Sequence, residues 1–423
     1  MSPRLTLSFL IYSIILMVLC YLANPHFYYF NKDYKEIITR PSIAPPTQFK
    51  SLESSCVATA QYRYTEDRTG VAPSSYNPTS QVKIEKHIFP LNVGIHSASK
   101  SSPTIDDTGV YVGSDTGWFW KMNHNGEKIW EFYIPNSGNG IHGSAAVDDK
   151  KVFIGAYNGF LYALDKMSGE LIWANPVGDY IGASPLLANG AVFISAETGH
   201  PDGLIAKVDC NTGKTIWVSQ WLGGHSHSSP TFDKKNMQIL AGANSGRFYA
   251  FNEEDGTTNW AAQLKGQVKG TAMIHEGIAY FGSWDKHYHA VDTKTGKTLW
   301  SKFMGGRIQT SLTKVPGKNM GVTNTKRGEI IGIHLKTSEI LWRLKHGDPN
   351  HQFSILVTHN KSSKTPFLAW SRCKEYQLCI LDAITGKLIK NIDLPGPFTS
   401  VPFAYQNKVY ITLDGNNGMV ILE

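Results

Sequence analysis

The sequence lacks the short motifs by which several classes of enzyme are recognised. It has no GxSxG nucleophile turn, no HExxH zinc helix and no Gly-rich phosphate loop, so no catalytic set is visible. It also has no run of Lys or Arg, and its net charge of +7 permits acidic partners without indicating nucleic acid. Because its five cysteines form no CxxC pair, structural zinc and thioredoxin chemistry are not indicated either.

The sequence does contain a repeat of about 40 to 44 residues that is marked by tryptophan. Five of six regularly spaced tryptophans follow a glycine by four residues. The six are Trp130, Trp173, Trp217, Trp260, Trp300 and Trp342. Within residues 155–173, Asn158-Gly159 predicts a hairpin turn, the next residues have the composition of a strand, and a second turn leads to Trp173. Four short strands in a repeat of this length predict the blade of a β-propeller.

Two features of each repeat indicate how the blades would pack. A strand of small residues opens each copy and suits the crowded axis of a ring, and the single Trp after a Gly turn is predicted to wedge between neighbouring blades. A seventh copy has Lys390 in place of Trp, and an eighth stops at its third strand. The strand-like run over residues 82–95 is predicted to complete the eighth blade, which removes exposed sheet edges. The fold class predicted for residues 82–423 is therefore all-β, an eight-bladed β-propeller.

Two of the repeats carry a longer motif in full. They read Ala163-x-Asp165-x3-Gly169-Glu170-x2-Trp173 and Ala290-x-Asp292-x3-Gly296-Lys297-x2-Trp300. These residues resemble the tryptophan-docking motif of quinoprotein-like β-propellers, or PQQ-repeat propellers, and the resemblance extends from about residue 82 to residue 423. It implies the fold of the quinoprotein alcohol dehydrogenase-like superfamily. It leaves the function open, since that family includes pyrroloquinoline-quinone (PQQ) dehydrogenases and non-enzymatic scaffolds such as the BamB-type lipoprotein of outer-membrane protein assembly.

The N-terminal 81 residues precede the predicted ring. Leu5–Ala23 is an apolar run close to the length of a bilayer span, so residues 1–23 predict a transmembrane signal anchor, with a cleaved signal peptide and lipidation at Cys20 as alternatives. Residues 24–81, rich in Pro, Ser and Thr, predict a flexible tether. The alternative is that Tyr62–Tyr76 drapes over the ring and binds a partner. Each interpretation of the leader places the propeller outside the cytosol, in the periplasm, the cell envelope or the extracellular space.

Disulfides are permitted in an exported chain. Cys373 and Cys379 flank a short turn and would face each other across a hairpin, which makes them the favoured pair. Cys56 with Cys210 is a second hypothesis, for which the spacing offers no support.

Alignment of the repeats shows which residue precedes the small pair at the start of each inner strand. These residues form a candidate binding collar, made of Lys100, His142, His227, Lys269, Gln309 and Gln352. In a ring of eight, blades one and five lie opposite each other, so Lys100 and Lys269 would face across the mouth. The collar is predicted to be polar and partly basic. It would either dock an acidic or backbone-rich segment of a partner or be a ring of solvated loops without a ligand.

The histidine pairs His225/His227 and His287/His289 each place two imidazoles on one face of a strand. The spacing indicates no third ligand, so no metal site is predicted. In the family that the sequence resembles, a dehydrogenase holds PQQ with a Trp floor, calcium ligands and a lid of adjacent cysteines. This chain has no adjacent cysteines. No cofactor is therefore the main expectation, and PQQ with calcium is the alternative.

The main functional hypothesis is a non-catalytic cell-envelope scaffold for protein–protein interaction, similar to the BamB type. The chain would be a monomeric propeller with an unidentified protein partner, attached to the membrane through its N-terminal segment and without affinity for nucleic acid. The alternative is a PQQ-dependent dehydrogenase that oxidises alcohols or sugars above the propeller axis.

Overall fold

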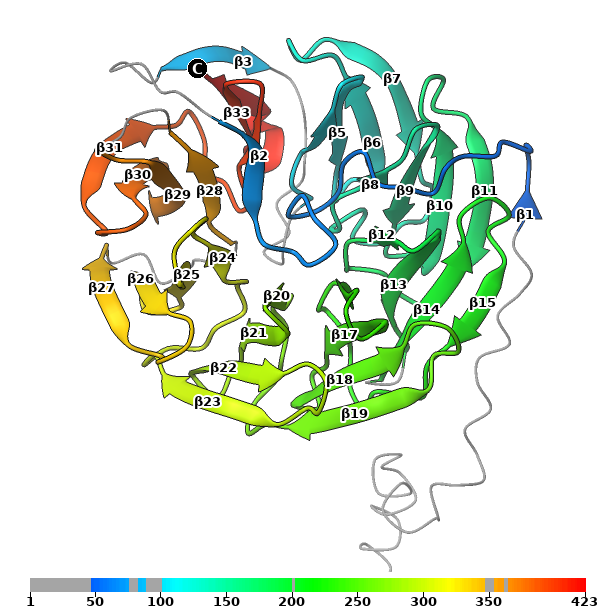
Figure 1. Ribbon diagram of the computed structural model, residues 1–423. Coiled ribbons are helices and arrows are strands. Elements are labelled where there is room, and N and C mark those ends of the chain that lie inside the picture. Colours follow the sequence, from blue (N-terminus) through cyan, green and yellow to red (C-terminus); the bar gives the residue numbers. More distant parts are fainter. Residues whose placement is uncertain (1–46, 76–82, 89–100, 200–201, 347–353, 361–363) are drawn as a thin grey trace, which may run out of the picture. The chain divides into compact units, whose positions relative to one another are not determined.

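The computed structural model describes residues 47–75, 83–88, 101–199, 202–346, 354–360 and 364–423 (Figure 1). The predicted anchor over residues 1–23 and the collar residues Lys100 and Gln352 lie outside these ranges. In the described part of the chain, no helix has the length and apolar character needed to cross a membrane. All elements below belong to one compact unit, Ala44–Glu423.

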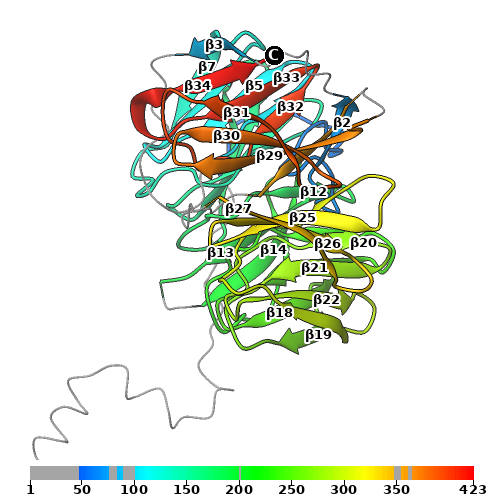
Figure 2. The same ribbon diagram turned by 90° about the vertical axis from the view of Figure 1, so that its left-hand side faces the viewer.

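The described strands form eight sheets around one axis, each with four antiparallel strands, so the predicted eight-bladed β-propeller is confirmed (Figures 1 and 2). From the axis outward, blade one contains β4 (Thr104–Asp106), β5 (Gly109–Gly113), β6 (Trp118–Met122) and β7 (Lys128–Tyr133), and blade two contains β8 (Ala146–Val147), β9 (Lys151–Gly155), β10 (Phe160–Asp165) and β11 (Leu171–Pro176). In the same order, blade three contains β12 (Leu186–Ala188), β13 (Ala191–Glu197), β14 (Gly203–Asp209) and β15 (Thr215–Val218), and blade four contains β16 (Thr231–Asp233), β17 (Gln238–Gly242), β18 (Arg247–Asn252) and β19 (Thr258–Gln263).

The remaining blades repeat this plan, with one outer strand taken from elsewhere in the chain. Blade five contains β20 (Met273–His275), β21 (Ile278–Gly282), β22 (His287–Asp292) and β23 (Thr298–Phe303), and blade six contains β24 (Thr313–Lys314), β25 (Met320–Thr325), β26 (Glu329–His334) and β27 (Ile340–Lys345). Blade seven contains β28 (Leu356–His359), β29 (Phe367–Lys374), β30 (Gln377–Asp382) and β31 (Leu388–Asp393). Blade eight contains β32 (Phe403–Tyr405), β33 (Lys408–Thr412), β34 (Met419–Leu422) and β3 (Ile84–Ile88). A short 3-10 helix, η2 (Gly415–Asn417), precedes β34.

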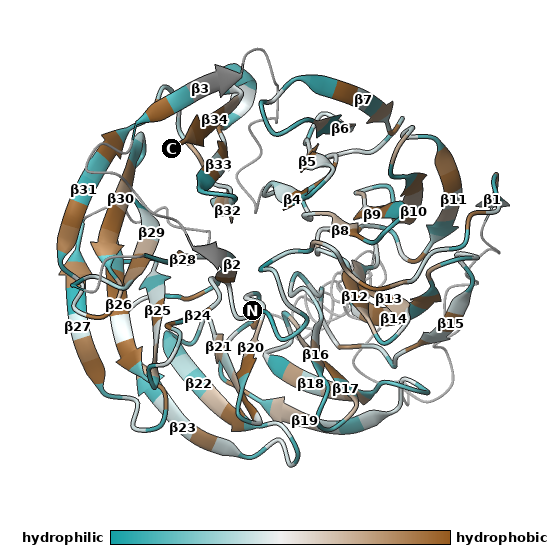
Figure 3. Cartoon of the chain, turned by 45° about the horizontal axis from the view of Figure 1, so that its top comes forward, coloured by the Kyte–Doolittle hydropathy of each residue, from teal (hydrophilic) through white to brown (hydrophobic). Residues whose placement is uncertain are grey.

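The hydrophobic core lies between the blades rather than within them. Each of the eight clusters of buried apolar side chains in the described residues joins two neighbouring blades. The second and third strands are buried on both faces, whereas outer strands such as β19 and β27 alternate between half-buried and exposed residues. The mixed hydropathy along the outermost strands is visible in Figure 3. Each blade therefore depends on its neighbours for burial.

Ring closure follows the prediction made from residues 82–95. Strand β3 pairs antiparallel with β34 and becomes the outer strand of blade eight, with Ile84 opposite Leu422. At the axis, hydroxyl groups link successive inner strands: the backbone N–H of Ser102 donates to Ser144 Oγ at 3.0 Å, and that of Val401 donates to Ser102 Oγ at 2.8 Å across the seam. The small residues of the inner strands thus supply hydrogen bonds as well as space.

The repeated tryptophans dock one blade onto the next. The indole of Trp130 lies against Gly169, where an added Cβ would come within 2.7 Å of the ring, and its Nε1 donates to the carbonyl of Lys166 at 3.1 Å. Gly169 also has a φ of 76°, which favours glycine. The indole nitrogens of Trp173, Trp217, Trp260 and Trp300 make the equivalent bond to the following blade.

Blade seven carries Lys390 at the tryptophan position, and the structure gives a reason. Blade eight takes its outer strand from β3, so it has no turn between its third and outer strands. The glycine turn on which a tryptophan would pack is therefore missing from the neighbouring blade, and a lysine at position 390 loses no docking contact.

Residues 47–75, which we call the strap, correct the prediction of a flexible tether over residues 24–81. β1 (Thr47–Gln48) adds to blade two beside β11, and β2 (Val71–Ser75) adds to blade seven parallel to β28. Between them the strap runs from the rim of the ring toward its centre (Figure 1). The compact propeller unit therefore includes residues before position 82. The remaining tether residues, 24–46 and 76–81, lie outside the described ranges.

The strap is held by one hydrogen bond from the inner strand of nearly every blade. Seven equivalent backbone N–H groups, one each from blades two to eight, donate to acceptors in the strap. The donors are Val147, Leu187, Phe232, Ile274, Lys314, Val357 and Ala404. These N–H groups lie at the free edges of the inner strands, and without the strap they would be left to bond with water. The strap packs against the ring although its sequence has no regular apolar pattern, because most of these seven hydrogen bonds are accepted by its backbone carbonyls.

Two buried arginines extend from the strap into the axis. Arg68, which has no exposed surface, donates to the carbonyls of Pro230 at 3.2 Å and Pro185 at 3.0 Å. Arg63 donates to the carbonyl of Leu312 at 2.6 Å. Both arginines have φ near 58°, a conformation that non-glycine residues adopt at a cost, and the bonds around them offset it.

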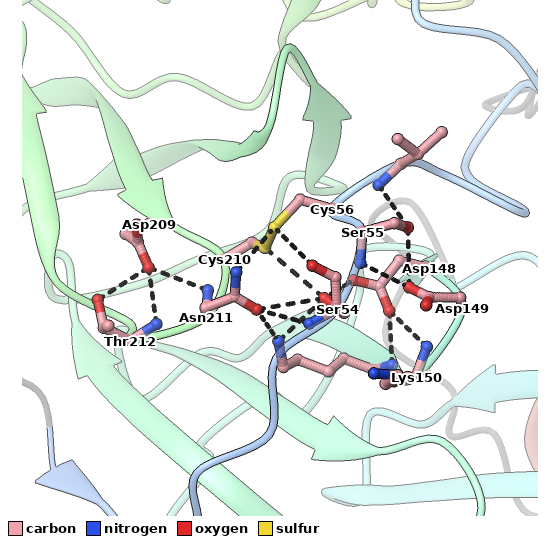
Figure 4. Close-up of a disulfide and its surroundings, with 12 residues drawn as sticks. Ser54, Ser55, Cys56, Asp148, Asp149, Lys150, Asp209, Cys210, Asn211 and Thr212 are labelled. Carbon is pink, nitrogen blue, oxygen red and sulfur yellow. Dashed lines mark hydrogen bonds between the residues drawn. A yellow bond between two sulfur atoms is a disulfide. The ribbon is translucent and has the colours of Figure 1, made fainter.

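A disulfide fastens the strap to blade three (Figure 4). Cys56 in the strap is bonded to Cys210, which follows β14, and the backbone N–H of Ser54 donates to Asn211 Oδ1 at 2.8 Å. A second disulfide, Cys373–Cys379, crosses the turn between β29 and β30. Both pairs were predicted from the sequence.

Candidate functional site

The two ends of the axis carry different groups. We call the end at which the inner strands begin the collar face, and the opposite end the strap face. Each inner strand runs from its collar residue at one end of the axis to the turn before the second strand at the other end. In blade five, for example, Lys269 lies at the collar face, and Ile274, five residues later, donates to the strap at the strap face. The strap face also has a cleft of about 1090 Å³ between the strap and the first turns of blades three to five.

The structure places four of the six predicted collar residues. His142 is buried, with its Nε2 3.2 Å from Asp115 Oδ1 and its ring 4.2 Å from that of Tyr157. His227 and Lys269 are half-buried and make the contacts described below, and Gln309 is half-buried. The four described collar residues are therefore buried or partly buried polar groups rather than freely solvated ones.

A basic and aromatic cluster occupies the part of the collar face that belongs to blades five and six. Trp284, in the turn after β21, has the Lys269 ammonium 4.3 Å and the Arg307 guanidinium 4.7 Å from its ring centre. Lys326 Nζ lies 5.6 Å from the same centre. In the described part of the chain, Trp284 Nε1 is buried without a hydrogen-bond partner. Three cations around one indole form a surface suited to an acidic or carbonyl-rich ligand.

The charges in this cluster are electrostatically strained. Burial lowers the pKa of the Lys269 ammonium, Glu197 opposes that shift, and Lys326 and Arg307 add to it. Burial, with a contribution from Arg307, also lowers the pKa of Lys326. A bound anion would relieve this repulsion, so the cluster has a physical reason to attract negative charge.

A second cluster lies at the start of blade four and the adjoining turn of blade three. His227 Nδ1 lies 2.9 Å from Glu197 Oε1, and His225 Nδ1 lies 3.3 Å from Glu197 Oε2. The Glu197 side chain is 5% exposed, and each imidazole is about one third exposed. The two histidines were noted in the sequence, but the carboxylate between them was not.

Five collar-face residues escaped the sequence analysis. They are Asp115, Tyr157, Glu197, Trp284 and Lys326, all near the turn between the second and third strands of their blades. A signal existed for three of them, since Asp115, Tyr157 and Trp284 each follow by two residues the glycine that ends a second strand. The same alignment that gave the collar would have given these positions.

Comparisons with known proteins agree with this architecture. The family model described as "Outer membrane protein assembly factor BamB" matches residues 117–201 and 201–369. BamB of Moranella endobia is 31% identical over 165 residues, which cover 37% of this chain and 40% of that protein. Tetrathionate hydrolase of Acidithiobacillus ferrooxidans is 25% identical over 289 residues, or 57% of this chain and 56% of that protein. The chain thus spans about half the length of these curated relatives.

Two solved structures share the fold. BamB from Moraxella catarrhalis superposes with a TM-score of 0.61 at 19% identity, covering 81% of this chain and 97% of that one. A europium-containing methanol dehydrogenase superposes with a TM-score of 0.69 at 13% identity, covering 85% and 90%. Since the family model spans residues 117–369 and thus more than half of the chain, the protein belongs to the family described as outer membrane protein assembly factor BamB.

Proposed function

We propose that this propeller is a non-catalytic scaffold of the cell envelope, located outside the cytosol, that binds a protein partner in outer-membrane protein assembly. The observation that carries the proposal is the difference between the two ends of the axis. The strap face is occupied by the chain's own residues 47–75, whereas the collar face presents Trp284 with three cations around it. Membership of the BamB family supports the choice of partner class.

The partner segment that suits the collar face is acidic or rich in free carbonyl groups. Such a segment would neutralise Lys269, Arg307 and Lys326, where burial and mutual repulsion lower the pKa values of both lysines. An aromatic residue next to several cations at the centre of a patch is also the composition of interaction hot spots. The docking alternative for the predicted collar is therefore the one that we favour.

The proposal is tested by charge reversal at the collar face. We expect the double variant Lys269→Glu/Arg307→Glu to recover about tenfold less outer-membrane assembly protein than wild type from solubilised envelopes, measured by quantitative mass spectrometry. The matched control is Lys234→Glu/Lys235→Glu, which makes the same charge change on the strap face, where Lys234 is 80% exposed. Equal recovery by all three proteins would contradict docking at the collar face.

A PQQ-dependent dehydrogenase is the second candidate, because the indole of Trp284 and the surrounding cations offer a flat basic surface that suits an aromatic tricarboxylate. The residues fit calcium less well, since imidazole nitrogens face Glu197 where calcium prefers oxygen ligands. Calorimetric titration of PQQ with Ca²⁺ into the full-length protein distinguishes the candidates. Saturable binding at about micromolar concentration would favour the enzyme, and its absence the scaffold.

A further inference from the structure

We propose that Glu197, His225 and His227 form a binding site for one divalent transition-metal ion of the zinc class at the collar face. Glu197 ends β13 in blade three, and the two histidines lie in the segment that enters β16 of blade four. The site therefore bridges two blades. It is separate from the proposed protein-binding cluster around Trp284.

The ligand atoms converge in the manner that a small metal ion requires. One nitrogen of each histidine and one carboxylate oxygen all lie within 4.8 Å of one another. Each histidine faces a different oxygen of the carboxylate, at 2.9 Å for His227 and 3.3 Å for His225, and both separations are slightly shorter than the roughly 3.4 Å between ligands of a tetrahedral zinc ion with bonds of about 2.1 Å. Three protein ligands leave a fourth position for water.

The electrostatics of the cluster are compatible with a cation. The carboxylate of Glu197 is nearly fully buried and faces the two imidazole nitrogens, and a buried carboxylate needs a positive partner or several donors. A divalent ion shared with both imidazoles would supply that charge. Two nitrogens and one oxygen favour zinc, copper, nickel or cobalt over calcium or magnesium, which prefer oxygen ligands.

The backbone around the ligands is held in place before any ion binds. The N–H of Asn244 donates to the carbonyl of His225 at 2.9 Å, and the hydroxyl of Ser226 donates to the carbonyl of Gly242 at 3.0 Å. At Gly224, a Cβ would lie 2.5 Å from the nitrogen of Ser245, so only glycine permits this close approach. Such preorganisation lowers the cost of binding a metal.

One feature limits the expected affinity. His225 Nε2 is buried and has no hydrogen-bond partner among the described residues, whereas tight zinc sites orient each imidazole through its second nitrogen. We therefore expect a dissociation constant of about micromolar magnitude rather than the much tighter binding of structural zinc sites.

The chain contains a control cluster with similar chemistry. Asp285, His287 and His289 also place one carboxylate beside two imidazoles, with His289 Nε2 3.1 Å from Asp285 Oδ2 and His287 Nδ1 3.6 Å from Asp285 Oδ1, but two of their nitrogens have further partners. His289 Nδ1 lies 3.0 Å from Ser301 Oγ, and His287 Nδ1 lies 2.9 Å from the carbonyl of Asp285. Each cluster has one carboxylate and two imidazoles, and of these described residues only Glu197, His225 and His227 offer one ligand atom each within 4.8 Å of one another.

The experiment is a calorimetric titration of Zn²⁺ into chelator-treated, untagged, full-length protein in a Cys20→Ser background, which removes the one cysteine outside the disulfides. We expect one saturable site. Glu197→Gln and His227→Gln should each weaken binding by more than the roughly 10- to 100-fold that loss of an outer-shell partner costs, whereas His287→Gln should leave it unchanged. Circular dichroism of each metal-free variant shows whether the fold is retained.

Two further measurements keep the result decisive. Co²⁺ should give visible absorption bands that disappear in Glu197→Gln, and a large excess of Ca²⁺ should not displace Zn²⁺. Absence of saturable binding, equal loss in His287→Gln, or displacement by Ca²⁺ would overturn the proposal. Since neither Trp284 nor Lys269 is altered, failure here would leave the proposed protein docking untouched.

Discussion

The polar groups at the two ends of the propeller axis find their hydrogen-bond partners in different ways. Eight inner strands converge at each end and present polar groups that need partners. At the strap face the chain's own residues 47–75 satisfy seven of the eight inner strands. At the collar face the partners are side chains of the blades themselves. Buried polar atoms without a hydrogen-bond partner among the described residues occur at both ends, namely Arg63 Nη1 and Asp67 Oδ1 in the strap and His225 Nε2 and Trp284 Nε1 at the collar face.

Under the proposed function, the strap face serves stability and the collar face serves binding. Buried arginines that donate to carbonyls contribute to the folded state, whereas half-buried lysines with lowered pKa values do not. The proposed acidic partner segment would relieve the repulsion among these cations. Substitutions at the strap face should therefore change stability, and those at the collar face should change binding.

The largest effect is expected from removal of the disulfide that fastens the strap. Cys56–Cys210 closes a loop with a sequence separation of 154, against 6 for Cys373–Cys379. In the chain-entropy model, the variant that lacks Cys56–Cys210 should lose about 5 kcal/mol of unfolding free energy. The variant that lacks Cys373–Cys379 should lose about 2 kcal/mol. Thermal or denaturant unfolding of both variants measures the difference.

Hydrogen exchange locates that effect. Loss of Cys56–Cys210 should speed exchange of the Phe232 and Ile274 amides, which donate to the strap, and loss of Cys373–Cys379 should not. Equal protection in the two variants would show that the strap does not need its disulfide.

A pair of cation substitutions compares the two faces directly. Arg68→Met leaves the carbonyls of Pro185 and Pro230 without their donors, so we expect a loss of about 3 kcal/mol in unfolding free energy. Lys269→Met removes a cation that burial disfavours and that Glu197 only partly compensates, and stability should stay within about 0.5 kcal/mol of wild type. A stability loss at Lys269 as large as at Arg68 would remove the distinction between the faces.

A pH dependence is expected from the strap face. Burial raises the pKa of the Asp106 carboxyl, but hydrogen bonds from Lys166, at 2.7 Å, and from Thr108 outweigh it, so that the pKa lies below its usual value. Thr59 of the strap donates to the same carboxylate at 3.0 Å. The stability that Asp106 contributes is therefore complete above a pH of about 4 and is lost as the pH falls through the lowered pKa.

The variant Asp106→Asn isolates this contribution. Its melting temperature should fall less steeply than that of wild type when the pH is lowered from about 5 to about 2, because it has no carboxylate to protonate at this position. Parallel curves for the two proteins would assign the acid sensitivity to other carboxylates.

The sequence predicted those parts of the fold that repeat. Trp130 and Gly169 could be recognised because the same pair recurs in other blades, and the closing strand could be placed because the eighth copy stops one strand short. The strap could not be predicted in this way, since its contacts occur once and are made largely by backbone groups that any sequence possesses. Proline and serine content was a misleading guide to its order.

The candidate site was predicted in part for a similar reason. His227 and Lys269 occupy a repeated position, but Glu197 comes from the preceding blade and is 28 residues or more from the histidines that it faces. Only the packing of blade three against blade four brings them together. The spacing of His225 and His227 in the sequence was enough to suggest two neighbouring imidazoles. The third ligand, Glu197, could be identified only from the three-dimensional arrangement of the blades.

The smallest expected effect links the two collar-face clusters. Lys269 interacts electrostatically with Glu197, so its positive charge should oppose a metal ion held by that carboxylate. We expect Lys269→Met to strengthen Zn²⁺ binding by about 3- to 10-fold, the effect of roughly 1 kcal/mol from one unit charge, while Lys234→Met at the strap face changes nothing. If both variants bind Zn²⁺ as wild type does, the clusters act independently, and the collar face holds two separate sites rather than one coupled surface.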